Sequence, residues 1–571
     1  MDSAAKDHRP RFPRPSPDLN AVLFMRGWRG LDPLHIGVLV RSEIEPWAAE
    51  ALRLLLSSPA ASVELIAELE LAEKPMVGGA LFRRHWAWST KRSERLAKTR
   101  PEPHAELPVS CRLGVDGGGG LAGETLLYLR QLALDVLIWL DSSRPKGDCE
   151  GVARYGLWSF CFGNPAGDLR EPPYYWEPWQ GEAIAPVTLL VHRESCDWAY
   201  ALECCFTAAR PSWYISQNHV EPLTMAGFLL ERRLWDLAET RSLPAPAPDS
   251  RVTGPGPGPG NAEAARCLAR LAKRSLSARL QGIRRGKPTW ISAVRFHPEG
   301  VGIEDGDTSA QNWTEIPRAA CHAFADPFII TWEGKTAIFV EDVPPGTKRG
   351  RLVGMEVSPD GLSEPFSVVE KPYHMSYPCV FEADGAVFMI PETAENRTVD
   401  LYRATDFPRT WVHEHTLIDG LDLVDTTPFF HDDTWYFFTS PAGPPANIST
   451  TFLFFSSSLT GEWIYHPCNP ICQDVRRARS AGHLRYRHGK LVRPSQDCSP
   501  SQDWSVGYGH AIQLNEVLSL SPTDYHERHL DTIPPSWRRD LIGAHTFNTA
   551  PGMQVIDGMA RERSGVFGFR R

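Results

Sequence analysis

The chain has 571 residues, of which 42% are hydrophobic and 23% charged, a composition typical of a folded protein whose length suits two or three domains. Its 60 Lys and Arg against 69 Asp and Glu give a net charge of −9. This argues against a binder of nucleic acid or of anionic membranes, because phosphate recognition needs a basic surface. The 45 Gly and 49 Pro favour turns and short strands over long helices.

The first residues predict a tail and no targeting signal. Residues 1–20 are rich in proline and charge, which predicts a disordered tail. They lack the apolar segment of a secretory signal, and nowhere does the sequence reach about 18 uncharged apolar residues. We therefore expect a cytoplasmic protein without a transmembrane segment.

Twelve cysteines are scattered along the chain without the spacing of a disulfide framework. Cys468 and Cys472 form one C-x3-C pair, but no second pair accompanies it. A zinc site usually needs two such pairs or histidines at ligand spacing, so no metal is predicted and the thiols are expected to be reduced.

Residues 21–242 alternate between strand-like and helix-like segments. Strands are expected at 35–40, 62–69, 134–140, 185–193 and 200–208, the last two as a strand pair, and helices at 45–58 and 123–133. This alternation predicts an α/β domain with an open parallel sheet and crossover helices.

Residues 243–261 alternate proline and glycine, which predicts a linker between two domains. Residues 262–284 follow with apolar residues at helical spacing among many arginines and lysines. They predict an amphipathic connecting helix, for which packing on a neighbouring domain is favoured over a role in binding.

Five segments in residues 285–571 share one plan: a polar start, an alternating strand, a turn and a second strand. They are 325–342, 376–393, 424–440, 480–497 and 543–558. They recur at intervals of about 50 to 60 residues, the period of propeller blades. Strand-like pieces between them leave room for four strands in each unit. The sequence therefore predicts an all-β five-bladed propeller.

Carboxylates occupy matching positions in this repeat. Asp326 and Asp425 open the first and third units, and Glu392 ends the hairpin of the second. The innermost strands of a propeller begin near its axis, so these side chains are expected to converge on one cavity. Paired carboxyls about 5–10 Å apart are what glycoside hydrolysis requires. These three are the predicted catalytic residues, with a structural role in turns as the alternative.

Other polar side chains near the starts of the units are candidate substrate contacts, each as compatible with a structural role. They are His374, Tyr377, Arg479, His483, Arg493 and His545.

The strings ADPF, SYP, IPE, ENR…LYRATDFP and VDTT resemble a propeller domain related to the family 43 glycoside hydrolases. The same domain forms the N-terminal part of plant glucosamine inositolphosphorylceramide transferases. The resemblance implies that Asp326 is the general base and that Asp425 modulates the pKa of the acid. The position of the family's catalytic acid departs from the pattern, because the fourth unit begins at Arg479 and has no glutamate there. Either Glu392 supplies the acid from another blade, or the cavity binds a glycan without cleaving it.

Residues 134–203 resemble the formyltransferase fold, whose members move a formyl group from 10-formyltetrahydrofolate to an amine. The resemblance implies an Asn-x-His pair and a later aspartate. Here the pair reads Ser159 and Cys161, while Asp197 matches the aspartate. The changed pair implies a degenerate site, so no cofactor is predicted unless formyl transfer has survived.

These observations favour a carbohydrate-active protein of glycan or glycolipid biosynthesis whose propeller binds or processes a sugar substrate. A furanosidase-type hydrolase of the family 43 kind and a formyltransferase acting on an amino sugar are the alternatives. The expected partner is a carbohydrate or a glycolipid precursor, and not a nucleic acid.

Overall fold

The structure is a computed structural model of the chain. It describes residues 32–69, 78–96, 111–116, 120–163, 173–180, 182–196, 198–214, 217–245, 258–285, 287–297, 312–501 and 507–562. The predicted tail of residues 1–20, most of the predicted linker and Asp197 lie outside these ranges.

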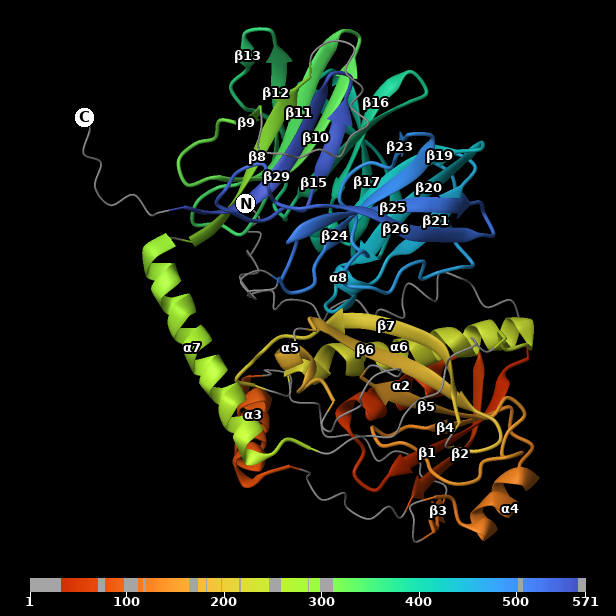
Figure 1. Ribbon diagram of the computed structural model, residues 1–571. Helices are drawn as coiled ribbons and strands as arrows, with labels where there is room; N and C mark the ends of the chain where they lie inside the picture. Colours follow the sequence, from red (N-terminus) through yellow and green to blue (C-terminus); the bar gives the residue numbers. More distant parts are fainter. Residues whose placement is uncertain are drawn as a thin grey trace, which may run out of the picture.

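A seven-stranded sheet forms the core of the N-terminal domain, in the order β3-β2-β1-β4-β5-β6-β7 (Figure 1). Its strands are β1 (Leu34–Arg41), β2 (Ala61–Leu69), β3 (Cys111–Leu113), β4 (Val136–Trp139), β5 (Leu157–Phe162), β6 (Ile184–His192) and β7 (Tyr200–Ala208). In this order the five strands β3, β2, β1, β4 and β5 each pair in parallel with the next. Strand β6 pairs antiparallel with both β5 and β7. The predicted open parallel sheet is therefore mixed, and its antiparallel edge includes the strand pair expected at 185–193 and 200–208. The connection 193–199 between β6 and β7 is too short for the crossover helix that parallel neighbours need.

Helices cover both faces of this sheet. The helices of this domain are α2 (Pro46–Ser57), α3 (Ala80–Leu96), α4 (Gly123–Gln131), α5 (Glu177–Gln180) and α6 (Gln217–Thr240), of which α3 lies to one side of the sheet (Figure 1). Alternate residues of a strand point to opposite faces. Val38 of β1 accordingly joins one core with α2 and α6, and Leu39 joins another with α4.

Helix α7 (Asn261–Arg285) follows, where a connecting helix at 262–284 was predicted. It lies beside α3 and rises toward the propeller (Figure 1). Among the helices that the structure describes, none combines the length and apolar character needed to cross a bilayer.

Five sheets of four or five strands make up the propeller, which confirms the predicted all-β fold of the C-terminal part. The first blade comprises β10 (Ala323–Trp332), β11 (Lys335–Val343), β12 (Arg351–Ser358), β13 (Gly361–Leu362) and β14 (Phe366–Val369), and the second comprises β15 (Ser376–Ala383), β16 (Ala386–Glu392), β17 (Thr398–Asp406) and β18 (Thr410–Asp419). The third blade comprises β19 (Leu423–His431), β20 (Thr434–Pro441), β21 (Phe452–Ser456) and β22 (Ile464–Tyr465). The fourth blade comprises β23 (Arg485–Arg487), β24 (Lys490–Asp497), β25 (Ala511–Leu520) and β26 (Tyr525–Ile533). A short helix, α8 (Ala446–Ser449), follows β20.

The fifth blade joins the two ends of the domain. It contains β27 (Leu541–Gly543), β28 (Phe547–Ala550), β29 (Met553–Glu562), β8 (Lys287–Phe296) and β9 (Trp313–Glu315). Strand β8 pairs antiparallel with β29 along its whole length. The ring is therefore closed by hydrogen bonds between the first and last long strands of the domain, a closure that the sequence repeat did not reveal.

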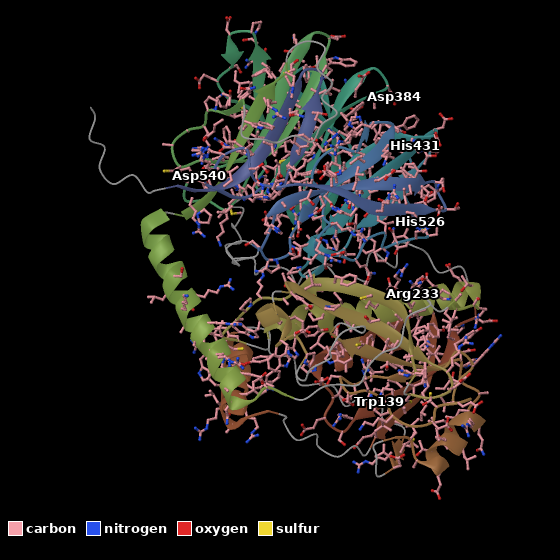
Figure 2. All side chains as sticks on the ribbon, in the orientation of Figure 1. Trp139, Arg233, Asp384, His431, His526 and Asp540 are labelled. Atoms are coloured by element: carbon pink, nitrogen blue, oxygen red, sulfur yellow. The ribbon has the colours of Figure 1, made fainter. Side chains whose placement is uncertain are left out.

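Two-residue turns connect the first two strands of four blades. In each turn both residues have positive φ; the pairs are Glu333–Gly334, Asp384–Gly385, Asp432–Asp433 and His488–Gly489. This is the type I′ geometry, whose twist matches that of the flanking strands. Figure 2 shows Asp384 of the second blade on the side of the propeller away from the N-terminal domain. The opposite end of this hairpin, where β15 begins, therefore lies toward that domain.

The two domains form a close interface through β7 and α6. Phe206 of β7 forms a parallel bridge with Asp474, with backbone hydrogen bonds of 2.9 Å to the residues on either side of that aspartate. Arg232 of α6 donates to the carbonyl of Asn469 at 2.6 Å and pairs with Glu203. One apolar cluster runs from the N-terminal sheet through α6 into the second and third blades.

Candidate functional site

The first strands of three blades share an irregularity at the same position. In β10, β15 and β19 the pairing register shifts, and the shift leaves a residue with positive φ: Asp326 at 50°, Tyr377 at 46° and Asp425 at 51°. Non-glycine residues rarely adopt positive φ, and a bulge redirects a side chain. Strained residues of this kind gather at functional sites. The matching positions predicted for Asp326 and Asp425 are therefore matching positions in the strand register.

Two glutamates hold equivalent positions on the second strands of the first two blades. Glu341 pairs with the residue just before Asp326. Glu392 pairs with the residue just before Tyr377. Sequence reasoning named Glu392 and missed Glu341, although aligning the string FVE of the first unit with IPE of the second would have revealed it.

Arg479 of the fourth blade joins two of these carboxyl groups. Its Nε lies 2.6 Å from Asp425 Oδ2, and its Nη2 lies 3.1 Å from Asp425 Oδ1 and 3.6 Å from Glu392 Oε2. Gln496 also donates to Asp425, at 3.0 Å. Because one nitrogen contacts both acids, their carboxyls lie within the separation of about 10 Å that glycosidase pairs keep. The bidentate contact to Asp425 is the geometry of a charged carboxylate.

Glu392 and Glu341, the two glutamates of the cluster, favour the protonated form. Burial, and then the neighbouring charge of Asp425, raise the pKa of Glu392 to about 8, against the opposing effect of Arg479. Burial and the charge of Asp326 hold the pKa of Glu341 well above its usual range. At neutral pH the site thus presents a protonated carboxyl group, Glu392, next to Asp425, which has the bidentate guanidinium partner. Such a pair separates the roles of base and acid.

Asp326 lies in a second hydrogen-bonded group, shared with the fifth blade. Burial raises its pKa to about 6, with Asp425 and Asp557 adding to the rise and His545 opposing it. Its carboxyl accepts a 2.7 Å bond from the hydroxyl of Thr546 and a 3.3 Å bond from the backbone N–H of Tyr377.

His545 forms an ion pair with the fully buried Asp557 and stacks on Trp290 with ring centres 3.8 Å apart. Although burial lowers the pKa of His545, the charges of Asp557 and Asp326 outweigh it and raise that pKa overall. Donor atoms of Asp326, His545 and Asp557 all lie within 4.8 Å of one another, a spacing that suits a metal ion. His545 and Asp557 already bond to each other, so the charges of these three side chains are balanced by contacts within the group.

The remaining predicted substrate contacts take different positions. His374 is half-buried at the edge of the cluster, with Nε2 3.6 Å from Glu341, and burial lowers its pKa. Tyr377 is fully buried, and its phenol bonds to Thr427 at 2.8 Å and to the backbone N–H of Gly482 at 2.9 Å. It therefore ties the second blade to the third and fourth.

His483 and Arg493 make contacts of a structural kind. Nε2 of His483 lies 2.9 Å from the carbonyl of Val380, and burial lowers the pKa of this histidine to about 4. The guanidinium of Arg493 binds both oxygens of Glu527 at 2.8 Å and donates to the carbonyls of two residues in the same blade.

In the N-terminal domain, the positions that resemble a formyl-transfer pair lie within the core. Ser159 and Cys161 are buried on β5. The hydroxyl of Ser159 lies 2.8 Å from Nε2 of His192, and Arg144 donates to the sulfur of Cys161 at 3.0 Å. Burial raises the pKa of the Cys161 thiol, so the thiol form is favoured over the reactive thiolate.

The N-terminal domain reaches the neighbourhood of the axial cluster. Arg210 donates to the carbonyl of Gly507 at 2.8 Å. The next residue, Tyr508, lies under the guanidinium of Arg479 at 5.3 Å and edge-on to His545 at 5.6 Å. The site is thus built from all five blades, and a residue of the other domain contacts its wall.

Fold and site together define a five-bladed propeller with a buried axial cluster of carboxyl groups that share one arginine. Residues 314–541 match the family model described as the N-terminal region of glucosamine inositolphosphorylceramide transferase 1.

Curated relatives carry the same description. The glucosamine inositolphosphorylceramide transferase 1 of Oryza sativa subsp. japonica is 31% identical over 210 residues, which is 36% of this chain and 27% of the relative. That of Arabidopsis thaliana is 31% identical over 230 residues, 39% of this chain and 29% of the relative. The chain therefore spans less than a third of the length of these relatives.

Solved structures resemble the propeller as well. The GH43 protein BlXynB of Bacillus licheniformis is 19% identical, with a TM-score of 0.31 over 39% of this chain and 48% of that one. The exo-β-1,3-galactanase 1,3Gal43A of Clostridium thermocellum is 14% identical, with a TM-score of 0.32 over 39% of this chain and 55% of that one.

Proposed function

We propose that the chain is a carbohydrate-active protein of glycan or glycolipid biosynthesis, and that its axial cluster binds and processes a sugar-bearing substrate. The observation that carries the proposal is the pair of Glu392 and Asp425 on one nitrogen of Arg479. The relatives named for inositolphosphorylceramide support a glycolipid as the partner.

The pair suits chemistry at a glycosidic bond. A protonated Glu392 donates its proton to a leaving oxygen, and a charged Asp425 stabilises the positive charge that develops on the sugar ring. Arg479 holds Asp425 in place and is positioned to contact a phosphate of a donor or acceptor. Asp326, whose pKa is about 6, accepts a proton from an attacking hydroxyl.

The test compares the full chain with the variants Glu392→Gln and Asp425→Asn. Transfer from sugar nucleotides to inositolphosphorylceramide is measured together with binding of the acceptor. We expect each variant to lose transfer by about 100-fold or more while the Gln variant still binds the acceptor. Glu414→Gln changes a surface glutamate that pairs with Arg403, and serves as the matched control. Unchanged transfer in both site variants would contradict the proposal.

The alternative function, hydrolysis of a glycosidic bond, is supported by the same separation between the carboxyls of Glu392 and Asp425. If the chain cleaves aryl furanosides and transfers no sugar, and if Glu392→Gln abolishes the cleavage, the hydrolytic function replaces the biosynthetic one. The formyltransferase alternative gains no support from the described residues, since Ser159 and Cys161 are buried and already bonded.

A further inference from the structure

Tyr508, which lies between β24 and β25 of the fourth blade, is held between the axial cluster and the N-terminal domain. The guanidinium of Arg479 lies over its ring at 5.3 Å, and the ring of His545 is nearly perpendicular to it at 5.6 Å. The tyrosine also packs in an apolar cluster that includes Ala208 at the end of β7. Arg210, just beyond β7, donates to the carbonyl of the residue that precedes the tyrosine, at 2.8 Å. Contacts from both domains therefore fix the position of this ring.

The hydroxyl of Tyr508 has no hydrogen-bond partner among the residues that the structure describes. Two other tyrosines of the propeller differ in this respect, since Tyr377 bonds to Thr427 and Tyr525 donates to Glu527. Tyr377 is fully buried, whereas Tyr508 keeps part of its surface exposed. A hydroxyl can both donate and accept a hydrogen bond. This one is fixed in place, unpaired and reachable, which suits contact with a bound molecule.

The charges around this hydroxyl favour a neutral group as its partner. Burial holds the pKa of the Tyr508 phenol well above its usual range, against the opposing charge of Arg479, so the phenol keeps its proton at neutral pH. The carboxyls of Asp425 and Asp326 also act on the phenol. A phosphate oxygen bound there would be repelled by these carboxyls. A sugar hydroxyl would instead accept from the phenol and donate to a carboxylate.

We propose that Tyr508 is a substrate-binding residue whose hydroxyl donates a hydrogen bond to one hydroxyl group of the bound sugar. The guanidinium of Arg479 covers the ring, so the hydroxyl makes the contact and the ring face does not. A site built to bond a substrate hydroxyl rejects an analogue that lacks it, because the polar groups of the site are then left unpaired. Tyr508 therefore selects sugars that carry a free hydroxyl at one position.

This role of Tyr508 rests on the proposed function, since it requires that the axial cluster binds a sugar. It also gives the N-terminal domain a part in the site. Ala208 and Arg210 belong to that domain, and both contribute to holding the segment that carries the tyrosine. The selectivity of the propeller for its sugar therefore depends on contacts that the propeller alone does not make.

The test compares the full chain with Tyr508→Phe, which removes only the hydroxyl and keeps the ring under Arg479. Isothermal titration calorimetry measures the binding of UDP-glucose, UDP-galactose and a nitrophenyl arabinofuranoside, which represent the proposed transfer and the hydrolytic alternative. We expect Tyr508→Phe to bind the preferred probe about 10-fold more weakly. Monodeoxy analogues of that probe are then titrated. The analogue that lacks the contacted hydroxyl should bind the wild type about 10-fold more weakly and should bind Tyr508→Phe no worse than the wild type.

The matched control is Tyr128→Phe, which removes an exposed phenol on α4 and should bind every probe as the wild type does. Thermal unfolding of both variants checks that the fold is kept. An equal loss for all monodeoxy analogues in Tyr508→Phe would overturn the proposal, because it would indicate an effect on the fold of the site. Inorganic phosphate that binds the wild type and binds Tyr508→Phe more weakly would overturn it too, since the partner would then be an anion.

Transfer assays separate the role of Tyr508 from the proposed function. If Tyr508→Phe binds every probe as the wild type does while Glu392→Gln loses transfer, only the role of Tyr508 is wrong. If Tyr508→Phe shows the expected dependence on one sugar hydroxyl while Glu392→Gln and Asp425→Asn keep full transfer, the sugar contact stands and the proposed catalysis is wrong. If the wild type binds none of the three probes, both are wrong.

Discussion

At the scale of single residues, the carboxyl groups of the axial cluster differ in the charged groups that they contact. Asp425 has a bidentate guanidinium partner, whereas Glu392 meets the same guanidinium only at 3.6 Å and lies next to the charge of Asp425. Of the two carboxyl groups that share this arginine, Glu392 therefore has a raised pKa and favours its protonated form. Sequence reasoning found Asp326, Asp425 and Glu392 because they open or close repeated units. It missed Glu341 and Asp557, whose importance depends on a strand register and on contacts between distant blades.

A pH dependence of stability follows from the raised pKa of Glu392. Its folded value of about 8 lies above the ordinary 4.5, so the folded chain keeps a proton that the unfolded chain releases between these values. Stability should therefore fall as pH rises from about 4.5 to 8, in the same direction as the raised pKa of Asp326 predicts. Urea unfolding across this range should show a shallower fall for Glu392→Gln. The control Glu414→Gln should keep the wild-type slope, and identical slopes for all three proteins would refute the assignment.

At the scale of elements, the blades were predictable because their hairpins repeat strand and turn signals at a regular interval. Each strand pair lies in one stretch of sequence, so local patterns define it. Strand β8 gives no such signal, because its partner β29 is more than 200 residues away. In the N-terminal sheet the pair of strands at 185–193 and 200–208 was expected, but its antiparallel direction was not, because alternation of strands and helices does not report the direction of pairing.

The third-blade turn offers a test at this scale. Asp432 and Asp433 adopt φ of 46° and 55°, a conformation that Asn-Gly tolerates better than Asp-Asp. The double variant Asp432→Asn, Asp433→Gly should raise the free energy of unfolding by about 0.5–1 kcal/mol, measured by urea titration. Asp360→Gly, in a turn where residue 360 lacks positive φ, should give no gain. A loss of stability in the double variant would show that the turn residues are not strained.

At the scale of the whole molecule, the interface formed by β7 and α6 holds the N-terminal domain against the propeller. Arg232 is buried between Glu203 of β7 and the carbonyl of Asn469 in the propeller, and Glu203 also accepts a 2.9 Å bond from Gln473. The sequence predicted a proline- and glycine-rich linker between the two domains but no contact between them. Long-range contacts of this kind leave no local pattern, which is why the docking could not be read from the chain.

Replacing the buried Arg232 with alanine should weaken the coupling between the unfolding of the two domains. Arg232→Ala leaves Glu203 buried with one cation fewer, which should cost about 3–5 kcal/mol. In calorimetry, the variant should unfold in two steps where the wild type unfolds in one. Arg403→Ala breaks the exposed pair with Glu414 and should change stability by less than about 1 kcal/mol. A single unfolding step in Arg232→Ala would mean that the apolar contacts alone couple the domains.

The bridge between Phe206 and Asp474 has a consequence for the N-terminal domain in isolation. Strand β7 is the last strand of its sheet, and the propeller segment around Asp474 covers part of its open edge. A fragment that ends before the propeller would expose that row of unpaired backbone groups, a template for pairing with a second copy of itself. The propeller thus protects its neighbour from self-association, and the two halves of the chain are expected to stay together wherever the N-terminal half has to remain monomeric.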